Sequence, residues 1–348
     1  MKIGIIGAGI AGLSAGRELA KAGHQVSIIE KSQKYGGRLA TDSGELHQGI
    51  WMDYGIPCFT AESPEFSGFI SELLDKEKVK VWENPFSLYD GEQFHMENPN
   101  PTGKLRYTSV EGMNSIAAYL GRWVDLQLDV KAGGLTYFGP HRRLKKAWMI
   151  NLTNFNTFEA DAVIVATPAP QAYGVILTCQ DEVNTLKIIR EIDEIHYDPA
   201  FTMRVTYGNR QIPSWPGVIC QDDRIEFISN ESSKRNDSTV NSIVIRSTSE
   251  FALKFRNVDE EQVKEMMLDR VSAIIGGWTA TPDKSKLHFW RYYRPKTFLN
   301  RPFMDFEGLE SPLALVGDYF NGNNADAAYS SGIKLARHWI KKYEGVKA

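Results

Sequence analysis

The 348-residue sequence is poor in cysteine, in net charge and in long apolar runs. Its three cysteines, Cys58, Cys179 and Cys220, form no close-spaced pair, which argues against a disulfide framework or a zinc site, and we predict no metal. A formal net charge of −3 gives no general attraction to nucleic acid, and we interpret the short basic run at 141–146 as a solvated turn. No stretch approaches the roughly 20 uninterrupted apolar residues that span a membrane. We therefore expect a cytoplasmic protein without nucleic acid or stable membrane insertion among its interactions.

What the sequence does contain begins at residue 3, where an apolar strand leads into a glycine turn. Ile3–Ile6 is followed by the turn Gly7-Ala8-Gly9-Ile10-Ala11-Gly12, then by a helix expected over 13–22 and a second strand, Val26–Ile29. This order of strand, turn, helix and strand predicts a βαβ unit that binds a dinucleotide.

Each residue of the turn has an expected task. Gly7 allows the tight turn, Gly9 lets backbone N–H groups approach a pyrophosphate, and Gly12 lets the helix pack closely on the strand. Glu30 ends the second strand, near the roughly 20-residue offset at which an acid binds the adenosine ribose. Because the sequence has no second G-x-G-x-x-G, we expect no separate NAD(P)H-binding domain.

A second glycine motif favours FAD over NAD. Lys31 and the following polar residues lead to Gly36-Gly37-Arg38, in which paired glycines allow close backbone approach and a guanidinium can bind a diphosphate. Taken alone, this segment would be interpreted as a surface turn. In combination with the first motif, it indicates an FAD site.

The segment Trp51–Thr60 contains Asp53-Tyr54-Gly55, which resembles the D-x-G element that follows the Gly-Gly-Arg motif in flavin amine oxidases. The resemblance implies that the next residues, Ile56, Pro57 and Cys58, line the flavin. It also implies that Val130, at the end of a strand expected over 124–130, presents its backbone to the adenine, although plain strand packing is an equal alternative.

The C-terminal part carries a third element of this kind. Leu313–Val316 predicts a buried strand that ends in Gly317-Asp318, and a helix is expected from Ala325 to about Tyr343. An acid at the end of the strand can accept a hydrogen bond from a ribityl hydroxyl, and the start of the helix can face the pyrimidine edge of the flavin.

Together these motifs resemble the flavin amine oxidase superfamily over nearly the whole chain. Within it, Val165–Gln171 and His288–Tyr292 are most similar to the renalase-like branch. The resemblance implies non-covalent FAD, a catalytic domain inserted into the FAD domain, and oxidation of a small organic hydride donor with oxygen, which is returned as hydrogen peroxide. The cofactor-binding residues that we predict are Gly7, Ala8, Gly9, Ile10, Ala11, Gly12, Glu30, Lys31, Gly37, Arg38, Gly55, Ile56, Pro57, Cys58, Val130, Gly317, Asp318, Ala325 and Ala327.

The sequence departs from larger amine oxidases where those enzymes carry a lysine near the flavin. Thr202 aligns with that lysine, which argues against ordinary amine oxidation. Catalytic residues are not identified, but Thr202, Trp290 and Tyr292 are candidates for the substrate pocket, with strand packing as the alternative for the two aromatic residues.

The expected fold is α/β, a Rossmann-type FAD-binding domain with an inserted α+β substrate domain built on an antiparallel sheet. We assign 1–59, 106–170 and 287–348 to the FAD-binding domain, and 60–105 and 171–286 to the substrate domain, whose sheet we expect to cover the flavin. The favoured function is an FAD-dependent oxidase of a reduced or isomeric dihydronicotinamide nucleotide. The alternatives are oxidation of an amine, desaturation or isomerisation of an apolar molecule, or a flavoprotein that is not an enzyme.

Overall fold

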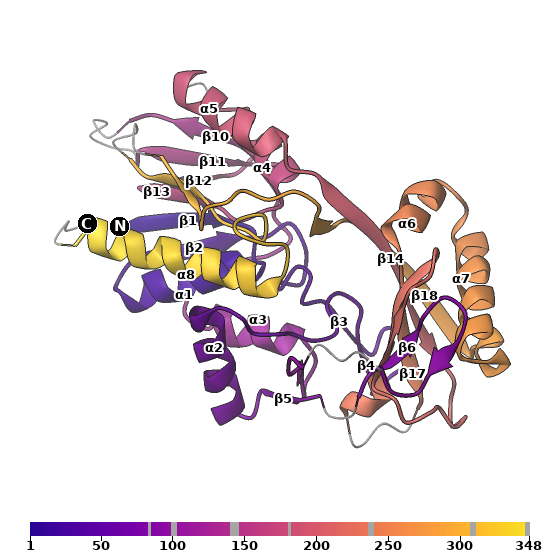
Figure 1. Ribbon diagram of the computed structural model, residues 1–348. Helices are drawn as coiled ribbons and strands as arrows, with labels where there is room; N and C mark the ends of the chain where they lie inside the picture. The colour runs from indigo at the N-terminus through magenta and orange to yellow at the C-terminus, as the bar shows by residue number, and fades with distance from the viewer. Residues whose placement is uncertain are drawn as a thin grey trace.

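The computed structural model describes residues 1–82, 85–98, 103–139, 146–179, 182–235, 240–306 and 311–344, and shows two lobes joined by long strands (Figure 1). The basic run at 141–146 lies, apart from Lys146, outside the described residues. Within the described ranges, no helix combines the length and the apolar character needed to cross a membrane.

The nucleotide-binding lobe is built on a six-stranded sheet, parallel except for one edge strand. Its strands, in spatial order, are β19 (Met304–Asp305), β20 (Leu313–Leu315), β13 (Ala162–Val165), β1 (Lys2–Ile6), β2 (Gln25–Ile29) and β9 (Asp125–Gln127). Both faces of this sheet are buried, because Ile3 and Ile5 of β1 pack on one side while Ile6 packs on the other. Burial on both faces accounts for the continuous apolar runs of β1 and β13.

Helices cover one face of the sheet, and a small sheet with two further helices covers the other. The first layer consists of α1 (Ile10–Lys21), α2 (Pro64–Asp75), α3 (Asn114–Gly121) and α8 (Ala325–Lys342). The second consists of β10 (Ala132–Tyr137), β11 (Trp148–Leu152), β12 (Thr157–Ala160), α4 (Ala169–Ile176) and α5 (Glu182–Asp193).

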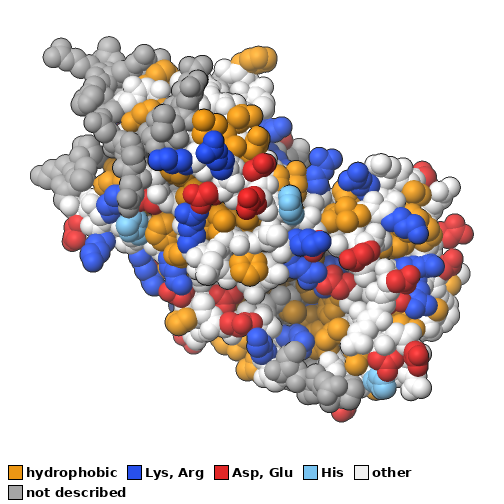
Figure 2. All heavy atoms as spheres, turned by 45° about the horizontal axis from the view of Figure 1, so that its top comes forward, with side chains coloured by type: hydrophobic (Ala, Val, Ile, Leu, Met, Phe, Trp, Pro, Cys, Tyr) orange, Lys and Arg blue, Asp and Glu red, His pale blue; other side chains and the backbone are white. Residues whose placement is uncertain are grey.

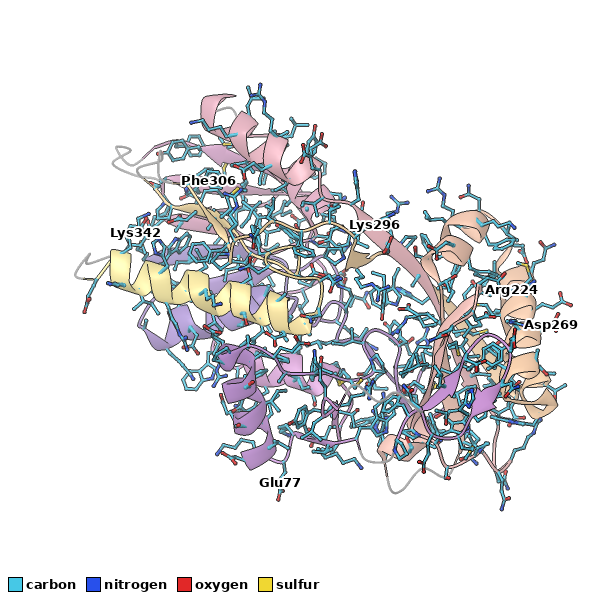
Figure 3. All side chains as sticks on the ribbon, viewed as in Figure 1. Glu77, Arg224, Asp269, Lys296, Phe306 and Lys342 are labelled. Carbon is cyan, nitrogen blue, oxygen red and sulfur yellow. The ribbon has the colours of Figure 1, made fainter. Side chains whose placement is uncertain are left out.

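The sheet lobe is built on seven strands that are antiparallel except for the pair β15 and β6. In spatial order they are β18 (Lys284–Pro295), β14 (Tyr197–Thr206), β17 (Ser242–Ser247), β16 (Ile225–Asn230), β15 (Gly217–Cys220), β6 (Ser87–Tyr89) and β7 (Phe94–His95). Helices α6 (Ser249–Phe255) and α7 (Glu260–Ile275) cover its outer face. Figure 3 shows Asp269 of α7 at the outer surface and Lys296, just after β18, between the lobes.

Alternation along β14 gives the two faces of this sheet different chemistry. Phe201, Met203 and Val205 pack in the core beneath α6 and α7. The intervening residues Thr202 and Arg204 are buried and polar, and Arg204 pairs with Asp42 of the nucleotide-binding lobe. Because side chains alternate between faces along a strand, β14 presents polar side chains on the face of the sheet that lies against that lobe, and we call this the polar face.

A hairpin of the nucleotide-binding lobe reaches across to this polar face. It consists of β3 (Thr41–Ser43) and β4 (Trp51–Asp53), and its residues Leu46, Ile50 and Met52 pack with Val244 of β17. Strands β5 (Val79–Val81) and β8 (Tyr107–Ser109) form a separate antiparallel pair. Among the described residues, the 3-10 helices are η1 (Glu231–Lys234) and η2 (Gly277–Ala280).

The expected fold class is confirmed, with three differences in detail. The strand expected over 124–130 is limited to Asp125–Gln127, because Asp129 adopts a left-handed backbone with φ of 58°. The domain boundary drawn at residue 286 falls inside β18, all of which belongs to the sheet lobe. Helices α2 and α5, which we assigned to the substrate domain, instead pack in the core of the nucleotide-binding lobe, where Phe66 and Leu73 of α2 and Ile188 of α5 are buried.

Candidate functional site

Of the three motif glycines in the turn after β1, only Gly9 has open space beside it. Gly7 has φ of +105°, and a Cβ on Gly12 would lie 2.2 Å from the Gly7 carbonyl oxygen. Gly9 has an extended backbone, with φ of −78° and ψ of 176°, and a Cβ there would meet no described atom within 4 Å. Neither backbone nor packing requires glycine at position 9, so its open side fits a bound pyrophosphate.

An unpartnered hydroxyl beside the turn supports the same assignment. Thr167 follows β13, and its methyl carbon lies 3.1 Å from the position of a Cβ on Gly7. The Thr167 hydroxyl oxygen is buried and has no hydrogen-bond partner among the described residues. Because buried hydroxyls are normally hydrogen-bonded, this atom also fits a bound cofactor.

The acid after β2 lies against the turn, as expected for a ribose-binding residue. The Glu30 carboxylate is 8% exposed and accepts the N–H groups of Ala8 and Ser32, both at 2.9 Å. Each carboxylate oxygen can accept a second hydrogen bond, which leaves capacity for ribose hydroxyls. The Val130 N–H donates to the Glu30 carbonyl oxygen at 2.9 Å, so Val130 lies at the same end of the sheet, and Lys31 is exposed.

The Gly-Gly-Arg segment also lies on the turn. Gly36 bridges to Gly9, and a Cβ on Gly37 would lie 3.6 Å from the Gly9 Cα. Arg38 then donates through Nη1 to Asp318 at 2.5 Å and to the Tyr293 carbonyl oxygen at 2.8 Å.

Arg38 and Asp318, two of the predicted cofactor residues, are therefore paired with each other. Burial by itself would lower the pKa of Arg38, but the Asp318 charge outweighs it and the pKa of Arg38 is raised. The Tyr197 hydroxyl donates to the second Asp318 oxygen at 3.0 Å. Tyr197 was not identified as a site residue, because nothing in its spacing marks a partner 121 residues away.

The predicted flavin-lining segment 55–58 packs directly on Arg38. A Cβ on Gly55 would lie 1.9 Å from the Arg38 carbonyl oxygen, which accepts the Ile56 N–H at 2.9 Å. Pro57 and Cys58 follow and are partly buried. Burial raises the pKa of the Cys58 thiol although the cations Lys234, Arg106 and Arg246 act in the opposite direction, so Cys58 is a neutral thiol at neutral pH.

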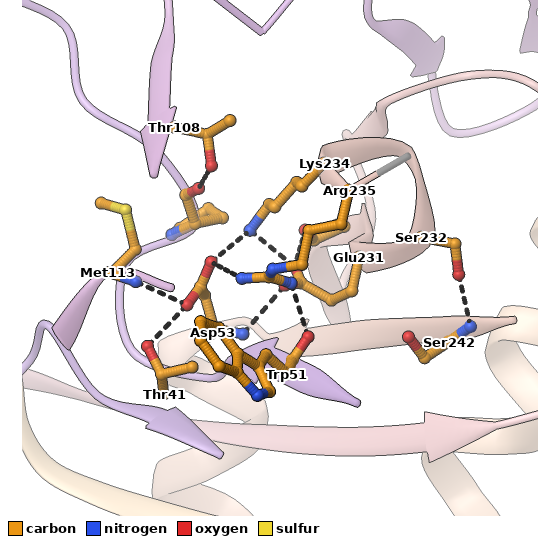
Figure 4. A network of polar contacts seen from close by, with 12 residues as sticks. Thr41, Trp51, Asp53, Thr108, Met113, Glu231, Ser232, Lys234, Arg235 and Ser242 are labelled. Atoms are coloured by element: carbon orange, nitrogen blue, oxygen red, sulfur yellow. Dashed lines mark hydrogen bonds and ion pairs between the residues drawn. The ribbon is translucent and has the colours of Figure 1, made fainter. Parts of the chain in front are cut away.

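Asp53, at the start of this segment, is the centre of a buried ionic network between the lobes (Figure 4). Its Oδ1 accepts the Met113 N–H at 2.9 Å and the Thr41 hydroxyl at 2.7 Å. Its Oδ2 accepts from Lys234 at 3.1 Å and from Arg235 at 3.2 Å. We call Asp53, Glu231, Lys234 and Arg235 the junction network, since Glu231 also binds Lys234, at 2.7 Å, and accepts the Asp53 N–H, at 2.9 Å.

Two of the three pocket candidates meet on the polar face of the sheet lobe. The indole N–H of Trp290 lies 3.1 Å from both the Thr202 hydroxyl oxygen and the Tyr54 carbonyl oxygen. The Tyr54 ring stacks on Trp290 with centroids 5.7 Å apart. Tyr292 instead packs edge-on against Tyr197 at 5.7 Å, near the Asp318 pair.

The C-terminal helix approaches the turn closely. A Cβ on Gly332 would lie 2.3 Å from the Ala11 carbonyl oxygen, so only glycine permits the packing of α8 on α1. Gly317 donates its N–H to the Ser331 hydroxyl at 3.2 Å. Ala327 lines a pocket at the start of α8 together with Ser63, Phe320 and Lys334, and Ala325 packs at the edge of the core.

Comparison with known families agrees with this geometry. A model of the NAD(P)-binding Rossmann-like domain matches residues 5–73, and a model described as flavin containing amine oxidoreductase matches residues 95–339. The second match covers well over half of the sequence, and the chain therefore belongs to the flavin-containing amine oxidoreductase family. The expected class of flavin-dependent oxidoreductase and its cofactor, FAD, are confirmed at this level, and the open side of Gly9 and the Thr167 hydroxyl fit that cofactor.

Individual relatives match short segments. An L-amino-acid oxidase of Siganus canaliculatus is 35% identical over 116 residues, which are 33% of this chain and 20% of that protein. An L-amino acid oxidase of Bothrops pictus is 50% identical over 86 residues, 25% and 16% of the two chains. A 15-cis-phytoene desaturase of Synechococcus elongatus is 30% identical over 90 residues, 26% and 18%. The matches thus span a fifth or less of these curated relatives.

Solved structures resemble the whole chain at low identity. Cyclohexylamine oxidase from Brevibacterium oxydans superimposes with a TM-score of 0.74 and 11% identity, covering 99% of both chains. A putrescine oxidase bound to putrescine has a TM-score of 0.72 and 13% identity over 98% of this chain and 99% of the other. At this identity the likeness establishes the fold alone.

Proposed function

We propose that this protein is a renalase-like FAD-dependent oxidase that takes a hydride from a small planar donor, a reduced or isomeric dihydronicotinamide nucleotide. In the reaction, a C–H bond of the donor breaks and both electrons leave with the hydrogen, so the donor becomes an aromatic cation. Oxygen receives this hydride equivalent and one proton from solvent, which gives hydrogen peroxide. FAD, when bound, supplies the two-electron acceptor that links the two half-reactions.

The observation that carries this proposal is the pair Thr202 and Trp290 on the polar face. Thr202 occupies the position aligned with the lysine of larger amine oxidases, and the Trp290 indole N–H is within hydrogen-bond distance of its hydroxyl. An aromatic surface backed by Tyr54 can orient a planar ring, and hydride transfer depends on orientation more than on an acid or base. Burial lowers the pKa of the nearby His288, with Arg204 and Lys286 adding to the effect, so that His288 is neutral at pH 7.

Anaerobic mixing of the FAD-loaded protein with a panel of dihydronicotinamide isomers tests the proposal. We expect at least one isomer to bleach the flavin absorbance within the turnover time, and admission of oxygen to yield one peroxide per donor oxidised. Trp290→Leu should slow bleaching about two- to tenfold, since aromatic stacking contributes about 0.5–1.5 kcal/mol. Trp123→Leu, which removes an exposed tryptophan of the other lobe, is the control. Absence of bleaching by every isomer would contradict the proposal.

A second candidate, amine oxidation, is favoured by the names of the L-amino-acid oxidase, putrescine oxidase and cyclohexylamine oxidase relatives. A panel of amines and amino acids assayed for peroxide and carbonyl product separates the two candidates. Turnover of an amine without bleaching by any dihydronicotinamide would replace the first proposal with the second.

A further inference from the structure

A row of cationic and aromatic side chains borders the predicted flavin-lining segment. Arg106 lies 4.2 Å from the Phe86 ring centroid, Phe86 stacks on Phe227 at 5.9 Å, and Arg246 lies 5.2 Å from Phe227 and 5.3 Å from Tyr293. We call these five residues the cationic wall. Cys58 packs against the aromatic cluster that contains Phe86 and Phe227.

Register places Arg246 and Phe227 of the wall on the polar face of the sheet lobe. Arg246 of β17 lies opposite Thr202 of β14 and opposite Phe227 of β16, and directly paired residues point to the same face. Tyr293 connects the wall to the cofactor residues, because its hydroxyl accepts from Arg246 at 2.7 Å and its carbonyl oxygen accepts from Arg38. Figure 2 shows the surface hollowed between the lobes, with hydrophobic side chains on its floor and Lys and Arg side chains beside it.

The wall carries more positive than negative charge. The single carboxylate of Glu226 is shared by two guanidinium groups, those of Arg246 and Arg294, each at 3.1 Å. Among the described residues, no carboxylate forms an ion pair with Arg106. The Arg246 side chain is 15% exposed, and no described residue accepts a hydrogen bond from its Nη2.

We infer that the cationic wall recognises an oxyanion, phosphate or carboxylate, on the planar substrate, with Arg246 as the residue that determines this specificity. The inference builds on the proposed function and narrows its substrate class. The aromatic faces give a planar molecule a stacking surface, and the held guanidinium presents free N–H groups to the oxyanion. Glu226 holds Arg246 in place but also competes with the ligand for its charge.

Equilibrium binding to the FAD-loaded protein, followed by the change in flavin absorbance, tests the inference without turnover. The probes are nicotinamide mononucleotide, nicotinic acid and nicotinamide riboside, which carry a phosphate, a carboxylate and neither. We expect at least one oxyanion probe to bind about tenfold or more tightly than the riboside. Which probe gains affinity identifies the oxyanion.

Substitutions of opposite sign separate recognition from a structural role. Arg246→Gln should weaken the oxyanion probe about tenfold and leave the riboside unchanged, whereas Glu226→Gln should tighten the oxyanion probe several-fold by removing the competing carboxylate. Arg246→Lys reports on folding and FAD content, and Arg256→Gln, which removes an exposed charge of α6's C-terminal end, is the matched control. Raised salt should weaken oxyanion binding to wild type more than to Arg246→Gln.

Weakening by both substitutions, or equal binding of all three probes, would overturn the inference. If no dihydronicotinamide reduces the flavin while the opposite effects at Arg246 and Glu226 hold, the proposed function fails and oxyanion recognition stands for another planar donor.

Discussion

At the scale of single residues, glycine is needed at the three motif positions of the first turn for different physical reasons. Gly7 needs its left-handed backbone and Gly12 needs to avoid the Gly7 carbonyl group, so both serve the protein's own packing. Neither reason applies to Gly9, and its open side is where we predict that the pyrophosphate binds. The sequence motif assigns a separate task to each glycine, and the structure adds the backbone angle of Gly7 and the close contact at Gly12.

We expect Gly9→Ala and Gly12→Ala to have contrasting effects. In the apoprotein, Gly9→Ala should change the free energy of unfolding by less than about 1 kcal/mol, since alanine tolerates that backbone but is a poorer N-cap of α1 than glycine. Gly12→Ala should lower it by about 1–3 kcal/mol through overpacking, although alanine favours helix. Urea unfolding measures both.

FAD titration by fluorescence quenching completes the comparison. Gly9→Ala should weaken FAD binding about tenfold or more because the methyl group occupies the pyrophosphate space. Unchanged FAD affinity in this variant would contradict the assignment of Gly9 to the cofactor.

At the scale of elements, β14 and the β3–β4 hairpin determine what the interior of the site contains. β14 carries buried polar residues on alternate positions, and Arg246 follows the apolar run 243–245 of β17. The sequence does not indicate which residues these side chains pair with. Arg204 pairs with Asp42 at 2.8 Å, 162 residues away, with both side chains almost fully buried.

The junction network should contribute more to stability than a surface ion pair. Lys234→Met removes a cation whose side chain is fully buried and leaves two buried carboxylates with one guanidinium, so we expect a loss of about 3–5 kcal/mol in the free energy of unfolding. Lys264→Met on α7, where the carboxylate partners are exposed, should cost less than about 1 kcal/mol. Equal losses in urea unfolding would contradict this view.

The same network predicts a loss of stability in acid. Burial by itself would raise the pKa of Asp53, but Lys234 and Arg235 outweigh it, and the pKa lies below its ordinary value of 3.8. A depressed folded pKa contributes stability above pH 3.8, which is lost as the pH falls through the lower folded value. Asp53→Asn should flatten the pH dependence of unfolding in this range, and an unchanged slope would count against the network.

At the scale of the whole molecule, buried polar contacts join the two lobes at separate places. The junction network, the Arg204–Asp42 pair and the bond from Arg38 to the Tyr293 carbonyl oxygen all cross the interface. Breaking the interface would expose unpaired charges, so the lobes are expected to keep one relative position.

We therefore expect the two lobes to unfold in one transition. Circular dichroism and tryptophan fluorescence should give coincident thermal curves, and excess FAD should raise the midpoint because it binds the folded state. Two separated transitions in the FAD-loaded protein would contradict a coupled interface.

The sequence by itself determined the βαβ unit and the FAD-binding class, because both depend on neighbouring residues and short spacings. It also predicted the C-terminal helix from Ala325 to about Tyr343, and α8 spans Ala325–Lys342. Only the tertiary structure decided that Arg38 binds Asp318, 280 residues away, and that Asp53 binds Lys234, 181 residues away. Charge pairing between distant segments leaves no spacing in the sequence, since the fold alone brings such groups into contact.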